Sequence, residues 1–441
     1  MLRALLACTL ALATSVGVFG QEHSSSENIG NKTAAFLDTI AAYFNEIRIA
    51  TAQHKDLWNY DLYGPVLLVQ PVTRELYANV ADSAGVLKGN GTIYRGILPK
   101  EVNIANTSVR WNGVEWAMIM LSLPANKNER VCLVTHELFH RAQPALGFKL
   151  YNTANSHLDQ KEGRIFLRLE LEALKAAVLA ESSAARRSHL RNAFTMREYR
   201  RSLFAGADTT ENLLELNEGL AEFTGLMMSG MKREEIQDHF RQSISAFLKN
   251  PTFVRSFPYQ TIPIYGYLLS NEKSTWNREI TAQSNLTDYL TKALNLNLPG
   301  DLKAAVAAIA DQYGGETVTA EETAREENRK KLIAEYKNKF IDQPHLVIVF
   351  EKMNISFDPR NIIPLGDQGM VYPTIRVTDN WGILTVERGA LLGANWDKIT
   401  VSTPLDINDS KVTGDGWTLE LKNGYAVEKV ASTNNYTVKK K

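Results

Sequence analysis

The spacing of apolar side chains changes along the chain and divides it into regions of different predicted structure. Residues 33–51 carry apolar side chains at helical intervals, and a mixed region with short strands continues to Pro124. Residues 127–340 again follow a mainly helical pattern, which ends in a charged stretch. The expected strands of the mixed region are residues 92–97, 102–105 and 116–123, with a hairpin turn at Asn112-Gly113.

After residue 340 the apolar runs become short and are separated by Gly, Asn and Asp, which indicates an all-β module. We therefore expect an α+β fold. Its catalytic region would be zincin-like and mainly helical, at residues 21–340 with a small sheet at about 60–124, and a β-sandwich or barrel would follow at 341–441. The expected C-terminal strands are residues 345–350, 372–377, 382–386, 390–392, 398–401, 417–421 and 425–429.

The first twenty residues follow the pattern of a secretory signal peptide. Arg3 supplies a positive charge, residues 4–13 an apolar core, and residues 18–20 a cleavage site. A lipid anchor at Cys8 fits less well, because the apolar run before it is short and continues past it. We expect an exported protein, periplasmic or extracellular, with no integral membrane segment after signal removal.

The charge balance argues against nucleic acid as a partner. Lys plus Arg and Asp plus Glu both number 49, so no net field attracts a polyanion or an anionic membrane. Without the signal peptide Cys132 is the single cysteine, and it cannot form an internal disulfide. Six arginines are interpreted as a solvated helix face, with a phosphate or acidic-peptide site as the alternative: Arg186, Arg187, Arg191, Arg197, Arg200 and Arg201.

Residues 136–140 read His-Glu-Leu-Phe-His, an H-E-x-x-H pentad. On a helix, His136 and His140 lie on one face, where two imidazoles can bind one Zn²⁺. Glu137 then lies beside the metal, where its carboxylate can take a proton from zinc-bound water and pass it to the leaving amine. The pentad therefore predicts peptide-bond hydrolysis. The alternative is a core helix whose histidines only form hydrogen bonds.

A hydrolytic zinc site usually has a third protein ligand. The segment 216–223, L-N-E-G-L-A-E-F, places Glu218 and Glu222 on one helical face. Glu218 can bind the metal while Glu222, in the second shell, orients a ligating imidazole. The alternative ligands lie between the two motifs, where their spacing is more typical of surface charges: Glu162 and Glu170.

The pentad together with the N-E-G-x-A-E segment resembles the gluzincin class of zinc metallopeptidases, with a thermolysin-like plan. The resemblance covers about residues 60–270 and implies that one helix supplies two His and the base while a later helix supplies the Glu. The connection between the motifs is longer than in thermolysin, so a helical insertion is expected. The resemblance implies one zinc ion with the ligands His136, His140 and Glu218, the general base Glu137, and Glu222 as support for a zinc-binding His.

A peptidase of this kind also needs a donor for the oxyanion that forms during attack. Three tyrosines stand among prolines and a glycine at residues 257–267, which is typical of a shaped loop before a helix. Tyr265 is the first candidate for the catalytic donor and Tyr259 the second, with core packing as the alternative role. His239 could serve instead.

These features predict an exported zinc-dependent peptidase that hydrolyses a peptide or protein substrate, either as an endopeptidase or as an aminopeptidase. We expect the substrate to add to an edge strand that precedes the zinc helix. The second hypothesis is a catalytically inactive zinc-binding protein, or one that contacts a glycan or surface through its C-terminal β domain. Glycan binding would be favoured by exposure of three side chains, and their burial would mean core packing: Trp381, Trp396 and Trp417.

Overall fold

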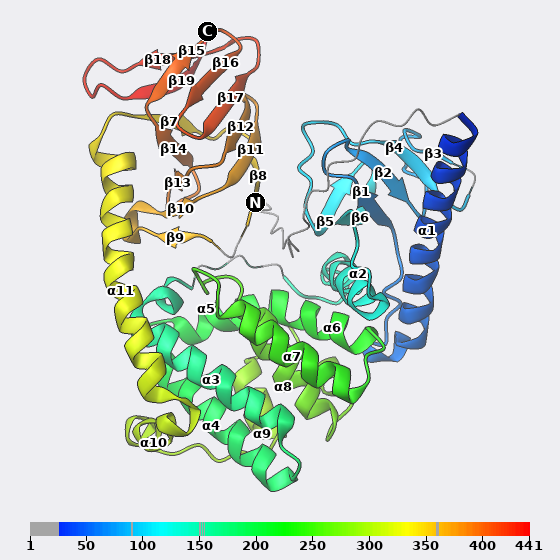
Figure 1. Cartoon of the computed structure of the whole chain (residues 1–441), viewed down its shortest axis with the longest axis vertical. Helices are drawn as coiled ribbons and strands as arrows, with labels where there is room; N and C mark the ends of the chain where they lie inside the picture. Colours follow the sequence, from blue (N-terminus) through cyan, green and yellow to red (C-terminus); the bar gives the residue numbers. More distant parts are fainter. Residues whose placement is uncertain (1–25, 90, 150, 152, 154, 359–360) are drawn as a thin grey trace. The chain divides into compact units, whose positions relative to one another are not determined.

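The computed structural model describes residues 26–441 except residues 90, 150, 152, 154, 359 and 360, so the expected signal peptide and Cys8 lie outside the described residues. The described chain is an α+β protein, as predicted, and it separates into two compact units (Figure 1). The N-terminal unit comprises residues 26–146 and Thr224–Gly230. The C-terminal unit comprises Gly147–Phe223 and Met231–Lys441. The predicted domain boundary at residue 340 stays a prediction.

The N-terminal unit contains a six-stranded sheet in the order β3-β4-β2-β1-β6-β5, with the helices α1 (Ser26–Gln53) and α2 (Lys127–Ala142) (Figure 1). Strands β1 and β6 are parallel, and the other neighbours are antiparallel. The helix predicted at 33–51 is confirmed as part of α1, whereas the strand predicted at 102–105 is wrong, because that segment is irregular. The strands are β1 Val66–Val69, β2 Glu75–Ala78, β3 Lys88–Gly89, β4 Tyr94–Ile97, β5 Thr107–Trp111 and β6 Val114–Met120.

The predicted hairpin between β5 and β6 is confirmed. Trp111 pairs with Val114 across the turn, and the two turn residues, Asn112 and Gly113, have φ angles of 46° and 79°. Asn and Gly tolerate positive φ better than other residues, and two such residues in succession match the twist of a tight hairpin. The sequence of this turn thus explains why β5 pairs with β6, and β5 lies at the edge of the sheet.

Alternation along the strands gives the sheet two apolar faces. Leu68 and Ile119 lie on the face that α1 and α2 cover, where they form a core cluster with residues such as Leu138. Leu67 and Met118 point to the opposite face and belong to a separate cluster. Helix α2 is therefore held against the sheet by its apolar side chains, which leaves its polar positions for other contacts.

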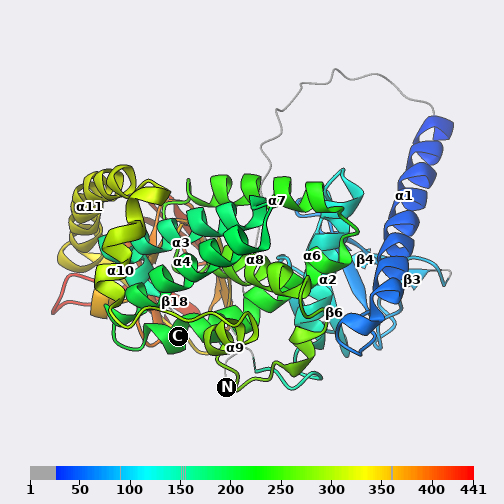
Figure 2. The same ribbon diagram turned by 90° about the horizontal axis from the view of Figure 1, so that it is seen from below.

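The C-terminal unit begins with a group of helices in which α3 and α4 pack along each other (Figure 2). A π-helical turn at Glu215–Gly219 joins α5 directly to α6 (Leu220–Met228), whose last turns belong to the N-terminal unit. Among the helices of the described residues, none is long and apolar enough to cross a bilayer. The other helices are α3 Lys161–Leu179, α4 Ser183–Ser202, α5 Ala207–Leu214, α7 Arg233–Phe247, α8 Pro258–Ser270, α9 Leu286–Ala293, α10 Leu302–Ile309 and α11 Gly315–Lys337.

The β region that follows contains two open sheets, ordered β18-β19-β7-β14-β13-β10-β9 and β15-β16-β17-β12-β11-β8, and neither closes into a barrel within the described part of the chain (Figure 1). The predicted strand 372–377 is instead two strands in different sheets, separated at Pro373. The strands are β7 His345–Val349, β8 Asn354–Phe357, β9 Ile363–Pro364, β10 Met370–Tyr372, β11 Ile375–Asp379, β12 Gly382–Val386, β13 Ala390–Leu392, β14 Lys398–Ser402, β15 Pro404–Ile407, β16 Lys411–Gly414, β17 Trp417–Leu421, β18 Tyr425–Lys429 and β19 Tyr436–Lys440.

The tryptophans of the β region are mostly core residues. Trp381 and Trp417 are 1% and 3% exposed, and the indole N–H of Trp417 donates to Ser402 Oγ at 3.0 Å. Trp396 alone of the three is partly exposed. By the criterion set from the sequence, two of the three side chains pack the core and offer no platform for a glycan.

Helix α4 contradicts the interpretation of its arginines as a solvated face for three of the six, whereas Arg187 and Arg191 are exposed. Arg197, Arg200 and Arg201 are 0%, 0% and 6% exposed, because this face meets glutamates of α3, α5 and the π turn. Glu170, interpreted as a surface charge, is also fully buried here. We call the three arginines with Glu170, Glu211 and Glu215 the buried ion cluster.

Each carboxylate of the buried ion cluster accepts hydrogen bonds from at least two arginines. Arg197 donates to Glu170 at 2.8 Å and to Glu215 at 2.7 Å and 3.0 Å. Arg200 and Arg201 both donate to Glu211 Oε2 at 2.8 Å. Such mutual compensation is what makes burial of charge tolerable, and loss of one partner leaves the others uncompensated.

We predict that Arg197→Met lowers the free energy of unfolding by about 3–5 kcal/mol, because two buried glutamates lose a shared cation. Urea unfolding followed by circular dichroism measures the change. Arg191→Met is the matched control, since Arg191 is exposed on the same helix. Equal effects of the two substitutions would contradict the structural role of the cluster.

The cluster also predicts how stability depends on pH. Burial alone would raise the pKa of Glu211, but attraction from Arg200 and Arg201 outweighs burial and holds this pKa well below its ordinary value. A depressed folded-state pKa gives stability above the unfolded-state pKa of about 4.3, and this stability is lost as the pH falls toward the folded-state value. The midpoint of urea unfolding should therefore fall less between pH 6 and pH 3 in Glu211→Gln than in wild type. The exposed substitution Glu234→Gln should leave the wild-type dependence unchanged.

Candidate metal centre

Helix α2 presents His136 and His140 on one face, with their Nε2 atoms 3.0 Å apart. Asn126 caps the start of the helix, where its side chain accepts hydrogen bonds from the first turn, and Gln143 caps its end. His140 Nδ1 lies 2.7 Å from Gln143 Oε1. Because an amide oxygen only accepts, Nδ1 carries the proton, and this leaves a lone pair on Nε2. The helix end thus sets the tautomer of one histidine.

The donor geometry of the two histidines fits a tetrahedral zinc ion. Two nitrogens at the usual Zn–N distance of about 2.0–2.1 Å are about 3.3 Å apart in a tetrahedral site. The observed separation of 3.0 Å between His136 Nε2 and His140 Nε2 is close to that value. Two ring nitrogens that face each other at this distance need a proton or a cation between them, since their lone pairs otherwise repel.

Glu137 follows His136 on α2 and is only 2% exposed. Its burial excludes bulk water from the carboxylate, which strengthens the attraction between that carboxylate and any neighbouring cation or developing positive charge. A buried carboxylate next to His136 suits the general-base role predicted for Glu137, and that role stays a prediction.

Glu218 lies on the π turn and is 2% exposed. Its Oε1 accepts from Asn217 Nδ2 at 3.1 Å, and its Oε2 accepts from the Tyr259 hydroxyl. Three residues earlier, Glu215 is held by Arg197 and by Thr261 Oγ1 at 2.6 Å. The buried ion cluster therefore anchors the turn that carries Glu218, and π turns are frequent at functional sites.

His136, His140 and Glu218 each offer one ligand atom, and these atoms all lie within 4.8 Å of one another. This is a group that could hold a metal ion. It is also the ligand set predicted from the sequence, and the identity of the ion as zinc stays a prediction. The alternative ligands are placed elsewhere, because Glu170 belongs to the buried ion cluster and Glu162 is exposed.

The surroundings of Tyr265 favour its alternative role in the core. Residues 258–270 form helix α8, so the loop predicted at 257–267 is wrong. Tyr265 is fully buried, stacks on Phe194 and donates its hydroxyl to Glu170 at 3.0 Å. Burial and the negative charge of Glu170 raise the pKa of this hydroxyl well above its ordinary value, so it stays protonated. Tyr259, whose hydroxyl contacts Glu218, becomes the better candidate for a catalytic donor.

Two contacts of the candidate ligands were not foreseen. Gln143 follows His140 by three residues, a helical spacing that could have suggested the hydrogen bond. Asn217 was noted beside Glu218, but nothing in the sequence indicated that its amide would hold the carboxylate. Glu222 is partly buried, and its predicted support of a zinc-binding histidine stays a prediction.

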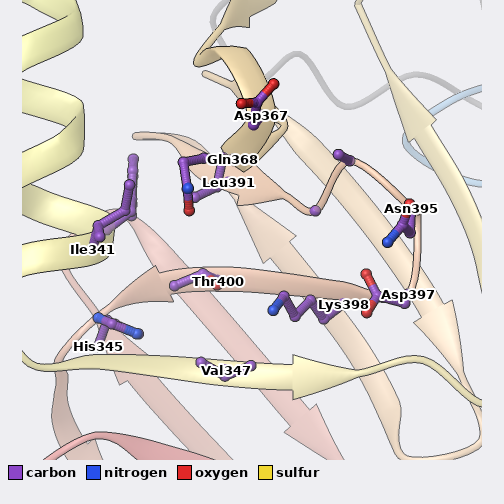
Figure 3. A pocket seen from close by; sticks show the side chains of 13 residues that line it. Ile341, His345, Val347, Asp367, Gln368, Leu391, Asn395, Asp397, Lys398 and Thr400 are labelled. Carbon is purple, nitrogen blue, oxygen red and sulfur yellow. The ribbon is translucent and has the colours of Figure 1, made fainter.

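A separate cavity of about 250 Å³ lies in the β region (Figure 3). His345 on β7 and Lys398 and Thr400 on β14 line one side, and Asp367 comes from a short helical turn. The lining is mostly polar and contains no tryptophan. Phe340 adds one aromatic ring to this polar lining.

The chain matches no protein-family model, no curated protein and no solved structure. The resemblance to the gluzincin class therefore rests on the pentad and on the His-His-Glu group, and it stays a prediction.

We predict that the purified protein binds one equivalent of zinc, and that His140→Ala and Glu218→Ala both lose it. Gln143→Ala should retain the site with zinc affinity lowered by about 10–100-fold, because the ring of His140 loses its orienting hydrogen bond. Metal analysis after dialysis against a chelator series measures both effects. Glu162→Ala is the control and should bind zinc as the wild type does. Zinc that survives Glu218→Ala would remove this residue from the ligand set.

Proposed function

We propose that the protein is an exported zinc metallopeptidase in which His136, His140 and Glu218 hold the ion and Glu137 is the general base. The single observation that carries the proposal is the group of two histidines and a glutamate around an H-E-x-x-H helix. A hydrolytic zinc site typically has three protein ligands and an adjacent carboxylate of this kind.

The packing of α6 on α2 within the N-terminal unit supports this ligand set. A Cβ atom at Gly225 would lie 2.5 Å from the carbonyl oxygen of Cys132, and one at Gly230 would lie 3.8 Å from Asn128 Oδ1. Later residues of one segment therefore meet earlier residues of the other. The two segments run antiparallel and are in close contact.

The positions of the proposed ligands along the two helices follow from the contact between Gly225 and Cys132. At a rise of about 1.5 Å per residue, Glu218 precedes Gly225 by about 10 Å. In the opposite direction along α2, His136 and His140 follow Cys132 by about 6 and 12 Å. Continuation of α6 through the π turn therefore brings Glu218 level with the two histidines, in agreement with the ligand group described above.

The proposed chemistry divides the work between the ion and the chain. When bound, zinc lowers the pKa of a water molecule to about 7 and polarises the scissile carbonyl. Glu137 takes one proton from the attacking water, whose oxygen forms a bond to the carbonyl carbon. As the C–N bond breaks, Glu137 passes that proton to the leaving nitrogen, which departs as an amine.

Two neighbours of Glu218 complete the proposed site. Asn217 and Tyr259 hold its two carboxylate oxygens and so fix the direction in which it presents a lone pair. Tyr259 also takes over the role first considered for Tyr265, as the hydroxyl donor for the oxyanion. Its hydroxyl is already beside a metal ligand, whereas that of Tyr265 is bound to Glu170.

The sheet offers a place for an extended substrate. Strand β5 is an edge strand, and it pairs with β6 through residues Thr107–Trp111. A peptide that adds to such an edge gains main-chain hydrogen bonds that do not depend on its side chains. We therefore propose that substrate binds along β5.

We predict that Glu137→Gln lowers the kcat of peptide hydrolysis by about 10²–10⁴-fold, the usual contribution of a general acid–base residue, with zinc content unchanged. Hydrolysis of a mixed peptide library, followed by mass spectrometry, measures the effect. Zinc content checks that the substitution leaves the ligands intact. A zinc-loaded wild type without hydrolysis would favour the alternative of an inactive metal-binding protein, and equal hydrolysis by both forms would exclude Glu137 as the base.

A further inference from the structure

Arg255 lies between α7 and α8 and is 1% exposed. Two of its nitrogens, Nε and Nη1, are buried without a hydrogen-bond partner among the described residues. A guanidinium is charged at any physiological pH and is rarely buried without compensation. Arg255 therefore differs from the arginines of α4, which share three glutamates.

The surroundings of Arg255 are aromatic and contain one relevant carboxylate. The rings of Phe357 and Trp396 lie 5.8 Å and 5.9 Å from its guanidinium carbon. The hydroxyl of Tyr372 forms a hydrogen bond with it, and the negative charge that acts on it is that of Glu218. Burial lowers the pKa of Arg255 in spite of these attractions.

Glu218 would compensate the charge of Arg255 only in part in the proposed enzyme. Its two oxygens already accept from Asn217 and Tyr259, and its charge would be shared with a zinc ion. Zinc and Arg255 together would carry three positive charges, against two negative charges on Glu218 and Glu137. This excess favours an anionic ligand beside the metal centre.

We propose that Arg255 binds the C-terminal carboxylate of the peptide substrate, so that the enzyme acts as a carboxypeptidase. The inference rests on the proposed function and names its substrate class. A terminal carboxylate carries its charge throughout the reaction and can therefore compensate Arg255 whenever substrate is bound, whereas an oxyanion exists only briefly. The neighbouring rings of Phe357 and Trp396 favour an apolar C-terminal residue.

Trp396 is the most exposed of the three aromatic side chains around Arg255. It is partly exposed, whereas Phe357 and Tyr372 are 5% and 0% exposed. Its backbone has a φ of 57°, and its N–H donates to the carbonyl of Gly393 at 2.9 Å in a tight turn. The turn holds the indole ring 5.9 Å from the guanidinium carbon.

The test compares one peptide that ends in leucine with its C-terminal amide. Wild type should hydrolyse the free acid with a kcat/KM about tenfold or more above that of the amide, as expected for a buried charge pair. Arg255→Met should lose this preference, so that its kcat/KM for the free acid falls to its own value for the amide, and Arg255→Lys should keep part of the preference. Arg241→Met, in an exposed arginine of α7, is the control. Equal hydrolysis of acid and amide by wild type, or an equal loss of both in Arg255→Met, would overturn the proposal.

A binding measurement covers the case in which Arg255→Met does not fold. Calorimetry with Glu137→Gln, which keeps Arg255, should show tighter binding of the free acid than of the amide, and equal binding would overturn the proposal. Calorimetry and hydrolysis together separate the proposed peptidase function from the proposed carboxylate site at Arg255. If wild type hydrolyses neither peptide, the proposed peptidase function fails. Tighter binding of the acid than of the amide in calorimetry would still support the carboxylate site at Arg255.

Discussion

The buried ion cluster is the interaction on which the candidate site depends. It joins α3, α4, α5 and the π turn through arginine–glutamate pairs that are shielded from water. Because Glu215 and Glu218 lie on the same turn, the pairs that fix Glu215 also fix the backbone that presents Glu218. A ligand held in this way is positioned before any ion arrives, which reduces the entropy lost on binding.

Local patterns predicted the parts of the fold that local spacing determines. The helices α1 and α2, the hairpin at Asn112-Gly113 and most of the C-terminal strands follow from periodicity and turn residues. The arginines of α4 show where such patterns fail. Their spacing reveals a polar face, but only the tertiary fold decides whether that face meets water or a second polar helix, and here it meets glutamates of other segments.

Some residues of the candidate site follow from short sequence motifs, and others depend on the tertiary fold. His136 and His140 are one helical turn apart, so a pentad suffices to place them together, and Glu218 is marked by a second short motif. Tyr259 lies 41 positions beyond Glu218, and its contact with that carboxylate depends on how α8 packs on the π turn. Arg255 lies outside any motif. Its unpaired nitrogens become visible only when the neighbouring β region is folded over it.

Gly225 shows that the proposed site is also shaped by a missing side chain. Any Cβ atom at this position would collide with the main chain of Cys132, so α6 can come this close to α2 only at a glycine. The approach of α6 to α2 is therefore set seven residues away from Glu218, by a residue that contributes no atom to the proposed metal site. A single added methyl group at this position would push α6 away from α2 and so weaken the support of the proposed site with every ligand still present.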